Sequence, residues 1–191
     1  MGWRLLASPE STLNNAEVAF IGLNPGGSAV DIEQSVYVMP EGKSAYVTES
    51  WAGHAPGKSP LQSQVRALFA RLAVAPDAVL AGNLVPFRSP DWQSLKDPQG
   101  SLRFGKELWR RILHQAKPSI VITMGSDTTK VIIDTLGVSN KKRYSVGWGH
   151  VTAQRGEFDG GTLIGLPHLS RFGVMNRAAS KDHLDRLFEK L

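Results

Sequence analysis

Four short apolar runs, each passing directly into glycine, proline or asparagine, constrain the fold more than any other feature of this sequence. The runs are VAFI at 18–21, AVLAGNLVPF at 78–87, SIVITMGS at 119–126 and TLIGLPHLS at 162–170. Short runs rich in Val, Ile and Leu that stop abruptly are typical of strands buried on both faces of a parallel sheet. Helical patterns lie between the runs, and this alternation predicts a parallel sheet covered by helices on both sides.

The helices are predicted from capping signals and from the spacing of apolar residues. Ser59 and Pro60 form an N-cap followed by proline at the first helical position, and apolar side chains between Leu61 and Leu72 then line one helix face. The other predicted helices are 102–116, 127–136 and a C-terminal helix that begins at Ser180.

These patterns predict an α/β fold: a three-layer α/β/α sandwich with a central, mainly parallel four-stranded sheet, formed by residues 1–191 as a single domain. The segments 28–58 and 137–161 have no regular pattern and are expected to be long loops, which are often functional in compact domains. Ligands of parallel sheets bind beyond the carboxyl ends of the strands. The turns after the four runs are therefore expected to converge on one cleft.

Composition excludes several kinds of chemistry. The chain has no cysteine, which excludes disulfides, thiolate nucleophiles, cysteine zinc sites and cysteine-ligated iron–sulfur clusters. Its five histidines form no HxH or HxxxH pair, so we expect neither a metal nor another cofactor. No apolar run has the length of a membrane helix, and the first thirty residues lack the apolar core of a signal peptide. We expect a cytoplasmic, monomeric protein with no membrane contact.

Positive charge is concentrated near the C-terminus. The chain has a net charge of +5, and residues 141–191 carry 9 basic and 5 acidic side chains. A basic region of this kind suits a polyanionic partner such as DNA.

Three polar side chains follow the predicted strands. The stretch 22–28 resembles a phosphate-binding loop, but Ser28 stands where that loop requires lysine. No GxGxxG follows the first strand, and no GxSxG is present, so the sequence supports neither a dinucleotide-binding domain nor a serine hydrolase. What remains at the strand ends is Asn24, Asn83 and His168. Taken singly, Asn83 could cap a turn and His168 could be a structural histidine.

In their order and spacing, GLNPGG, GNLVPFRSP, TMGS and LPHLSRF resemble motifs of the uracil-DNA glycosylase superfamily. Residues 22–26 look like the GxNPG motif of its mismatch-specific and single-strand-selective branches. The LPHLSRF stretch is similar to the family's HPSP motif, with Leu169 and Arg171 in place of both prolines. The iron–sulfur branches share the middle motifs, but the absence of cysteine removes them.

The resemblance implies a DNA glycosylase that flips a pyrimidine out of the stack and hydrolyses its N-glycosidic bond. It implies that His168 donates a hydrogen bond to the O2 atom of the departing base, that Asn24 positions the water, and that Asn83 reads the base edge. Gly26 stands where the uracil-only branch has a tyrosine that blocks 5-substituents. The pocket is therefore expected to admit 5-substituted pyrimidines. The residues expected to line it are Gly22, Leu23, Pro25 and Gly26, with Tyr46 and Trp51 as candidate stacking partners.

Further residues are expected to contact DNA. Ser170 and Arg171 would bind phosphates, Ser126 belongs to the TMGS motif, and Phe172 would fill the gap left by the flipped base. The basic run Lys141–Arg143 is either a DNA contact, through Arg143 above all, or a solvated loop.

Two alternatives stay open at this point. One is a defence glycosylase that removes a hypermodified cytosine, such as a glucosylated one, from phage DNA instead of acting in DNA repair. The other is a catalytically silent nucleic-acid-binding module, which would need neither Asn24 nor His168.

Overall fold

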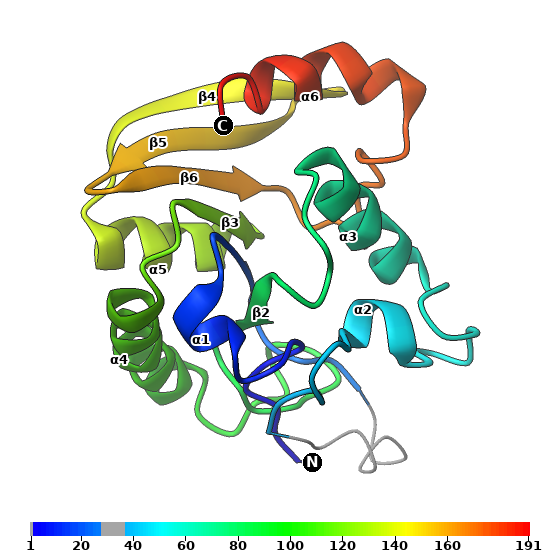
Figure 1. The fold of residues 1–191 in the computed structure, drawn as a ribbon, viewed down its shortest axis with the longest axis vertical. Helices are drawn as coiled ribbons and strands as arrows, with labels where there is room; N and C mark the ends of the chain where they lie inside the picture. Colours follow the sequence, from blue (N-terminus) through cyan, green and yellow to red (C-terminus); the bar gives the residue numbers. More distant parts are fainter. Residues whose placement is uncertain (1, 28–36) are drawn as a thin grey trace.

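The structure is a computed structural model that describes residues 2–27 and 37–191 (Figure 1). Its centre is one six-stranded sheet with the strand order β2-β1-β3-β6-β5-β4. The strands are β1 (Val18–Gly22), β2 (Leu80–Asn83), β3 (Ile120–Met124), β4 (Ser139–Trp148), β5 (Val151–Phe158) and β6 (Gly161–Leu166).

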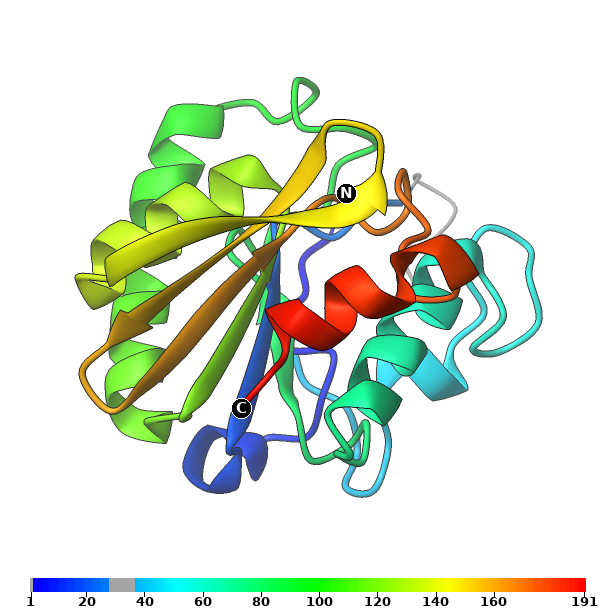
Figure 2. The same ribbon diagram turned by 90° about the horizontal axis from the view of Figure 1, so that it is seen from above.

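Helices cover both faces of this sheet, so that the molecule has three layers (Figure 2). One face carries α1 (Thr12–Asn15), α4 (Pro98–Ala116) and α5 (Ser126–Leu136), and the other carries α2 (Ala45–Thr48), α3 (Pro60–Arg71) and α6 (Lys181–Leu187), which follows the 3₁₀ turn η2 (Ala178–Ser180). The predicted helices are confirmed. The helix predicted at 102–116 begins earlier because Asp97 caps it, with its side chain accepting from the amide of Gly100, and Pro98 fits the first turn.

The four predicted strands are confirmed, and they form a parallel unit in the order β2-β1-β3-β6. The number of strands was wrong, because β5 and β4 extend this unit as an antiparallel hairpin. The segment 137–161 is this hairpin and not a loop. Residues 139–143 of β4 are all exposed, so the strand has no buried face there and gives no apolar pattern. The segment expected as a loop at 28–58 contains α2, and its part 28–36 lies outside the described residues.

Alternation along the central strands supplies two hydrophobic cores. Phe20 and Ile122 pack under α3 and α6, whereas their neighbours Ile21 and Val121 pack under α4 and α5. Successive side chains of a strand point to opposite faces, so each parallel strand has to be apolar throughout. Trp109 of α4 is completely buried in the second core.

The N-terminal segment covers the edge strand β2. Leu6 forms an isolated antiparallel bridge with Gly82, and Trp3 forms another with Phe87 beyond the end of β2. The amide of Ala7 donates to the carbonyl of Ala81 at 2.7 Å. The segment therefore satisfies backbone groups that an edge strand would expose. Among the described helices, none combines the length and apolarity that crossing a membrane requires.

Candidate active site

The turn after β1 holds the side chain of Asn24 in one orientation. Asn24 Nδ2 donates to the Ser89 hydroxyl at 2.9 Å, and that hydroxyl donates to the Asp91 carbonyl at 2.6 Å. Because Ser89 uses its only proton on Asp91, its oxygen has to accept from Asn24, and this fixes the orientation of the amide. Within the described part of the chain, no group donates to Asn24 Oδ1. This half-buried oxygen can therefore accept from a water.

Asn83 follows on the neighbouring strand and lies against Gly22. The two residues are register partners, and a Cβ atom on Gly22 would be 2.7 Å from Asn83 Oδ1. A side chain at position 22 would therefore displace the Asn83 amide from this position. The indole of Trp109 donates to the Asn83 carbonyl at 2.8 Å and anchors the backbone. The Asn83 amide has no side-chain hydrogen bond to any described residue, so both its donor and its acceptor can serve a ligand.

The turn after β3 lies beside the end of β6. Gly125 has a φ of +92°, which favours glycine, and its amide donates to the Leu166 carbonyl at 2.9 Å. A Cβ atom on Gly125 would be 3.9 Å from Cδ2 of His168, so the turn lies next to this ring. The predicted contact Ser126 is exposed and begins α5.

His168 begins a tight turn after β6. Its carbonyl accepts from the amides of Arg171 and Phe172, each at 2.9 Å, and Leu169 is buried in the core below. The Ser170 hydroxyl lies 2.9 Å from His168 Nδ1. When the hydroxyl donates to Nδ1, the ring proton of the neutral imidazole is on Nε2. Nε2 contacts no described hydrogen-bond partner and is available to donate to a ligand.

The protonation of His168 is set by two effects. Partial burial lowers the pKa of its imidazole below the usual 6.5, and the positive charge of Arg171 lowers it further. Both favour the neutral ring near pH 7. Neutral His168 and the two amides supply hydrogen-bonding groups that carry no charge of their own.

Phe172, predicted to fill the gap left by a flipped base, is half-buried and packs edge-on against Trp148, with ring centroids 6.1 Å apart. Arg177 lies over the other ring of this pair, 4.9 Å from the centroid of Trp148. The side chains that are exposed at this turn besides His168 are those of Ser170 and Arg171. They remain available for phosphates, whereas Phe172 would have to leave Trp148 to enter a duplex.

Arg143 lies on the outermost strand on the β4 side of the sheet. It is exposed on β4, two strands away from β6, and pairs in register with Gln154. Gln154 in turn pairs with Gly165, next to the last residue of β6, so Arg143 lies in line with the carboxyl end of that strand and its DNA contact stays a prediction.

The two predicted stacking residues differ in placement. Tyr46 is buried in the first core, where it makes edge-on contacts with Phe20, Phe69 and Trp51. Its predicted role as a stacking partner is wrong for this conformation, because core rings surround it. Trp51 is half-buried and can still offer part of its indole.

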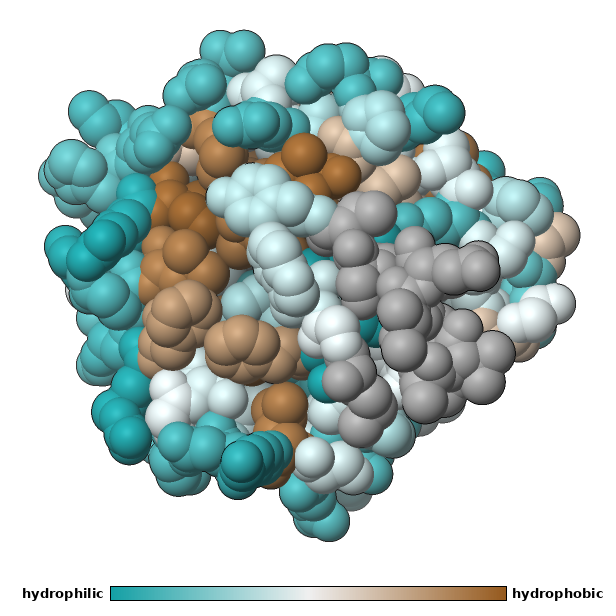
Figure 3. Space-filling view, turned by 90° about the horizontal axis from the view of Figure 1, so that it is seen from below, coloured by the Kyte–Doolittle hydropathy of each residue, from teal (hydrophilic) through white to brown (hydrophobic). Residues whose placement is uncertain are grey.

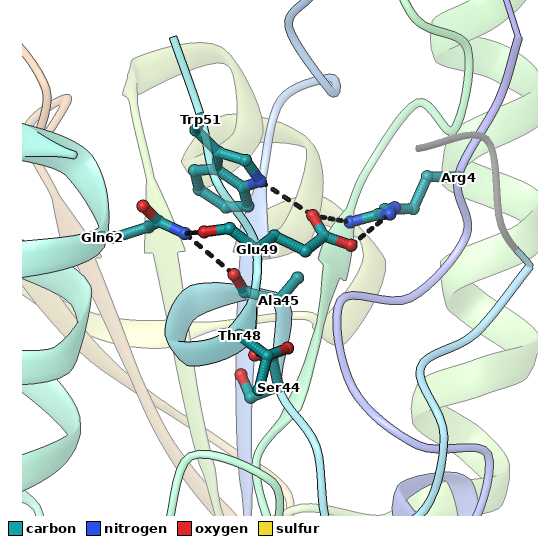
Figure 4. A network of polar contacts seen from close by, with 7 residues as sticks. All are labelled: Arg4, Ser44, Ala45, Thr48, Glu49, Trp51 and Gln62. Atoms are coloured by element: carbon teal, nitrogen blue, oxygen red, sulfur yellow. Dashed lines mark hydrogen bonds and ion pairs between the residues drawn. The ribbon is translucent and has the colours of Figure 1, made fainter. Parts of the chain in front are cut away.

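An ion pair holds Trp51 in place (Figure 4). Arg4 donates to both carboxylate oxygens of Glu49, at 2.6 and 2.7 Å, and the indole of Trp51 donates to the same carboxylate at 2.8 Å. Gln62 of α3 donates to the carbonyls of Ala45 and Glu49. The contacts join the N-terminal segment, α2 and α3. Sequence reasoning missed them because Arg4 and Gln62 are far from Glu49 in the chain.

We expect Glu49→Ala to lower the free energy of unfolding by about 3 kcal/mol, because the buried guanidinium of Arg4 loses its carboxylate. Urea denaturation measures the loss. Glu107→Ala is the matched control, since Glu107 forms ion pairs with Arg110 and Arg111 on the exposed face of α4. The control is expected to unfold at the same urea concentration as the unchanged protein. Equal effects of the two substitutions would contradict a structural role for the buried pair.

The model of the uracil DNA glycosylase superfamily matches residues 9–191. The chain belongs to this superfamily, and the resemblance seen in its motifs is confirmed at that level. A comparison with individual curated proteins gave no significant match. Superfamily membership associates the chain with DNA binding and with glycosylase chemistry.

Proposed function

We propose that this protein is a monofunctional DNA glycosylase that removes uracil or a 5-substituted pyrimidine and leaves an abasic site. The observation that carries the proposal is the placement of Asn24, Asn83 and His168 at or just after the carboxyl ends of β1, β2 and β6. These strands lie within one parallel unit, with the turn after β3 beside His168. All three side chains retain hydrogen-bonding atoms that have no partner among the described residues.

The reaction needs stabilisation of a leaving anion more than it needs a nucleophile. The bond between the sugar C1′ and the base N1 breaks, and its electron pair leaves with the base. A sugar oxocarbenium ion then accepts water at C1′, and the water loses a proton to solvent. Asn83 holds the edge of the base, and Nε2–H of His168 donates to its O2 atom as negative charge develops there. Asn24 Oδ1 orients the water but cannot take its proton.

The Ser170 hydroxyl keeps the ring proton of His168 on the nitrogen that faces the base. Neutral imidazole is the form that can accept from Ser170 at Nδ1 and donate from Nε2 at once. Ser170 can therefore position His168 as well as contact a phosphate.

The open space at Gly26 favours substrates with a group at C5. Gly26 is exposed, and a Cβ atom placed on it would have no described heavy atom within 4 Å. This observation supports 5-substituted pyrimidines, including the hypermodified cytosines of phage DNA, alongside uracil.

A panel of DNA substrates tests the proposed activity. We expect alkali-labile sites to form in oligonucleotides that carry uracil or 5-hydroxymethyluracil, with glucosylated hydroxymethylcytosine as the third substrate. Cleavage of the glucosylated substrate alone would favour a defence enzyme. Binding without cleavage of any substrate, under single-turnover conditions with excess protein, would contradict the proposal and favour a silent binding module.

The lowered pKa of His168 also predicts the pH dependence of excision. Because the neutral ring is the active form, the rate should be highest between about pH 8 and pH 7 and should fall at lower pH, with a midpoint below the usual histidine pKa of 6.5. Single-turnover rates across this range measure the profile, and melting temperatures at each pH control for unfolding. A step centred at or above pH 6.5 that disappears in His168→Ala would contradict the assignment of a neutral donor.

A further inference from the structure

Four exposed aromatic side chains form two contacting pairs on the N-terminal segment, the segment before α2, the segment after β2 and α4. They are called here the aromatic ledge and are Tyr37, Trp3, Phe87 and Phe104, which are 50%, 45%, 39% and 50% exposed. The rings of Trp3 and Tyr37 meet edge-on at 5.4 Å, and those of Phe87 and Phe104 meet at 5.5 Å. Figure 3 looks onto the side of the N-terminal segment, where apolar side chains gather within a hydrophilic border.

Backbone pairing places the two ring pairs on the same side of the chain. Trp3 and Phe87 are opposite each other in an antiparallel bridge, which places their side chains on the same side of the two strands. Phe104 belongs to α4, whose Gly105 packs closely on the Leu84 carbonyl. The ledge is thus built on the core and not on a free loop.

The ledge is continuous with the candidate site through the segment after β2. Phe87 lies between Asn83, which faces the proposed base pocket, and Ser89, whose hydroxyl accepts from Asn24. Phe87 and Ser89 are two residues apart, so their Cα atoms are within about 7 Å of each other. A DNA strand that places one base against Asn83 would therefore carry its neighbours past Phe87.

The chemistry of the ledge suits unpaired bases. Successive bases of a single strand stack on exposed aromatic rings without regard to sequence, and positive side chains nearby follow the phosphates. Arg103, next to Phe104, is exposed and has no carboxylate partner within residues 2–27 and 37–191. Exposed aromatic pairs of this kind mark an interaction surface and are not a typical feature of a free protein surface.

Resting on the proposed glycosylase function, we propose that the aromatic ledge is a second DNA subsite, which stacks the unpaired bases next to the nucleotide to be excised. The protein then prefers its target in single-stranded DNA, since paired bases have no free faces to offer Trp3, Phe87 or Phe104.

Binding to DNA without a target base tests the ledge separately from catalysis. The probes are fluorescein-labelled oligo-dT of about twelve nucleotides and an oligomer of equal length whose residues are all abasic. Both have the same charge, but only oligo-dT can stack. We expect the unchanged protein to bind oligo-dT more tightly by fluorescence anisotropy. Trp3→Ala and Phe104→Ala should each weaken oligo-dT binding roughly 5- to 100-fold and leave binding of the abasic oligomer unchanged.

Matched variants separate stacking from general apolar contact. Phe104→Trp should retain oligo-dT binding, whereas Phe104→Leu, which is apolar but not aromatic, should lose it. Leu191→Ala removes an exposed apolar side chain outside the ledge and should bind as the unchanged protein does. Equal binding by Phe104→Leu and the unchanged protein would overturn the proposal.

The remaining outcomes distinguish the ledge from the glycosylase function. Base excision that persists while Trp3→Ala and Phe104→Ala bind oligo-dT normally would overturn the ledge alone. Ledge-dependent oligo-dT binding without excision of any base would support the ledge and contradict the glycosylase. A dimer in sedimentation velocity that Trp3→Ala dissociates would show that a second copy covers the rings, and would also overturn the proposal.

Discussion

His168→Ala is expected to lower the single-turnover rate of base excision about 10²- to 10³-fold, while the affinity for substrate DNA changes little. In the proposed mechanism, Nε2 of His168 donates to charge that develops on the base only as the glycosidic bond breaks. The donor is already oriented, because Ser170 lies 2.9 Å from Nδ1 and the turn fixes the backbone. Removing one preorganised donor of this kind usually lowers the reaction rate by roughly two to three orders of magnitude.

Two controls make this result specific. His114→Ala changes an exposed histidine near the end of α4 and should retain the full rate. His168 is itself exposed, so His168→Ala should melt at the temperature of the unchanged protein. A rate that stays within about twofold, with intact folding, would make His168 a turn residue and the proposed donor wrong.

Gly26→Tyr is expected to abolish excision of 5-substituted pyrimidines and to spare uracil. Sequence reasoning left two explanations for this glycine: a backbone conformation that only glycine tolerates, or space that has to stay open beside C5 of the base. The structure favours the second. Gly26 has no positive φ, and a Cβ atom there meets no described neighbour within 4 Å. A tyrosine side chain can therefore be accommodated, and its ring would occupy the volume of a 5-substituent.

Paired excision assays on uracil and 5-hydroxymethyluracil, together with melting temperatures, measure this effect. We expect a loss of more than about 100-fold on the 5-substituted base only, because two groups cannot share one volume. Gly26→Ala is the matched control and should act on both bases as the unchanged protein does. Equal loss on both bases, or a collapsed melting temperature, would assign Gly26 to the turn.

The parallel part of the fold could be predicted because its strands are buried on both faces. Runs such as VAFI and IVIT have to be apolar throughout, and this signal survives without any knowledge of tertiary contacts. The hairpin of β4 and β5 could not be predicted in this way. It lies at the edge of the sheet, and the first half of β4 faces solvent, so its residues carry no periodic apolar pattern.

For the candidate site, too, local sequence predicted the features that depend on single strands and missed those that depend on tertiary contacts. The positions of Asn24, Asn83 and His168 at strand ends follow from local sequence, because a parallel sheet collects such ends at one edge. The hydrogen-bond partners of these residues do not follow from local sequence. Ser89 accepts from Asn24 across 65 positions, and only the packed fold brings these atoms together. Tyr46 was wrongly expected to stack on a base because its burial against Phe20 depends on how α2 docks, which sequence periodicity does not encode.

The segment before residue 9 has a practical consequence for work on this protein. The superfamily model begins at residue 9. Before it, Arg4 forms an ion pair with Glu49, and Leu6 pairs with the edge strand β2. A protein trimmed to the matched region would leave β2 open to pairing with other chains and would invite aggregation. A purification tag on the N-terminus would sit next to Trp3. Expression with residues 2–8 retained, and with any tag placed away from Trp3, keeps the edge covered and the aromatic rings clear.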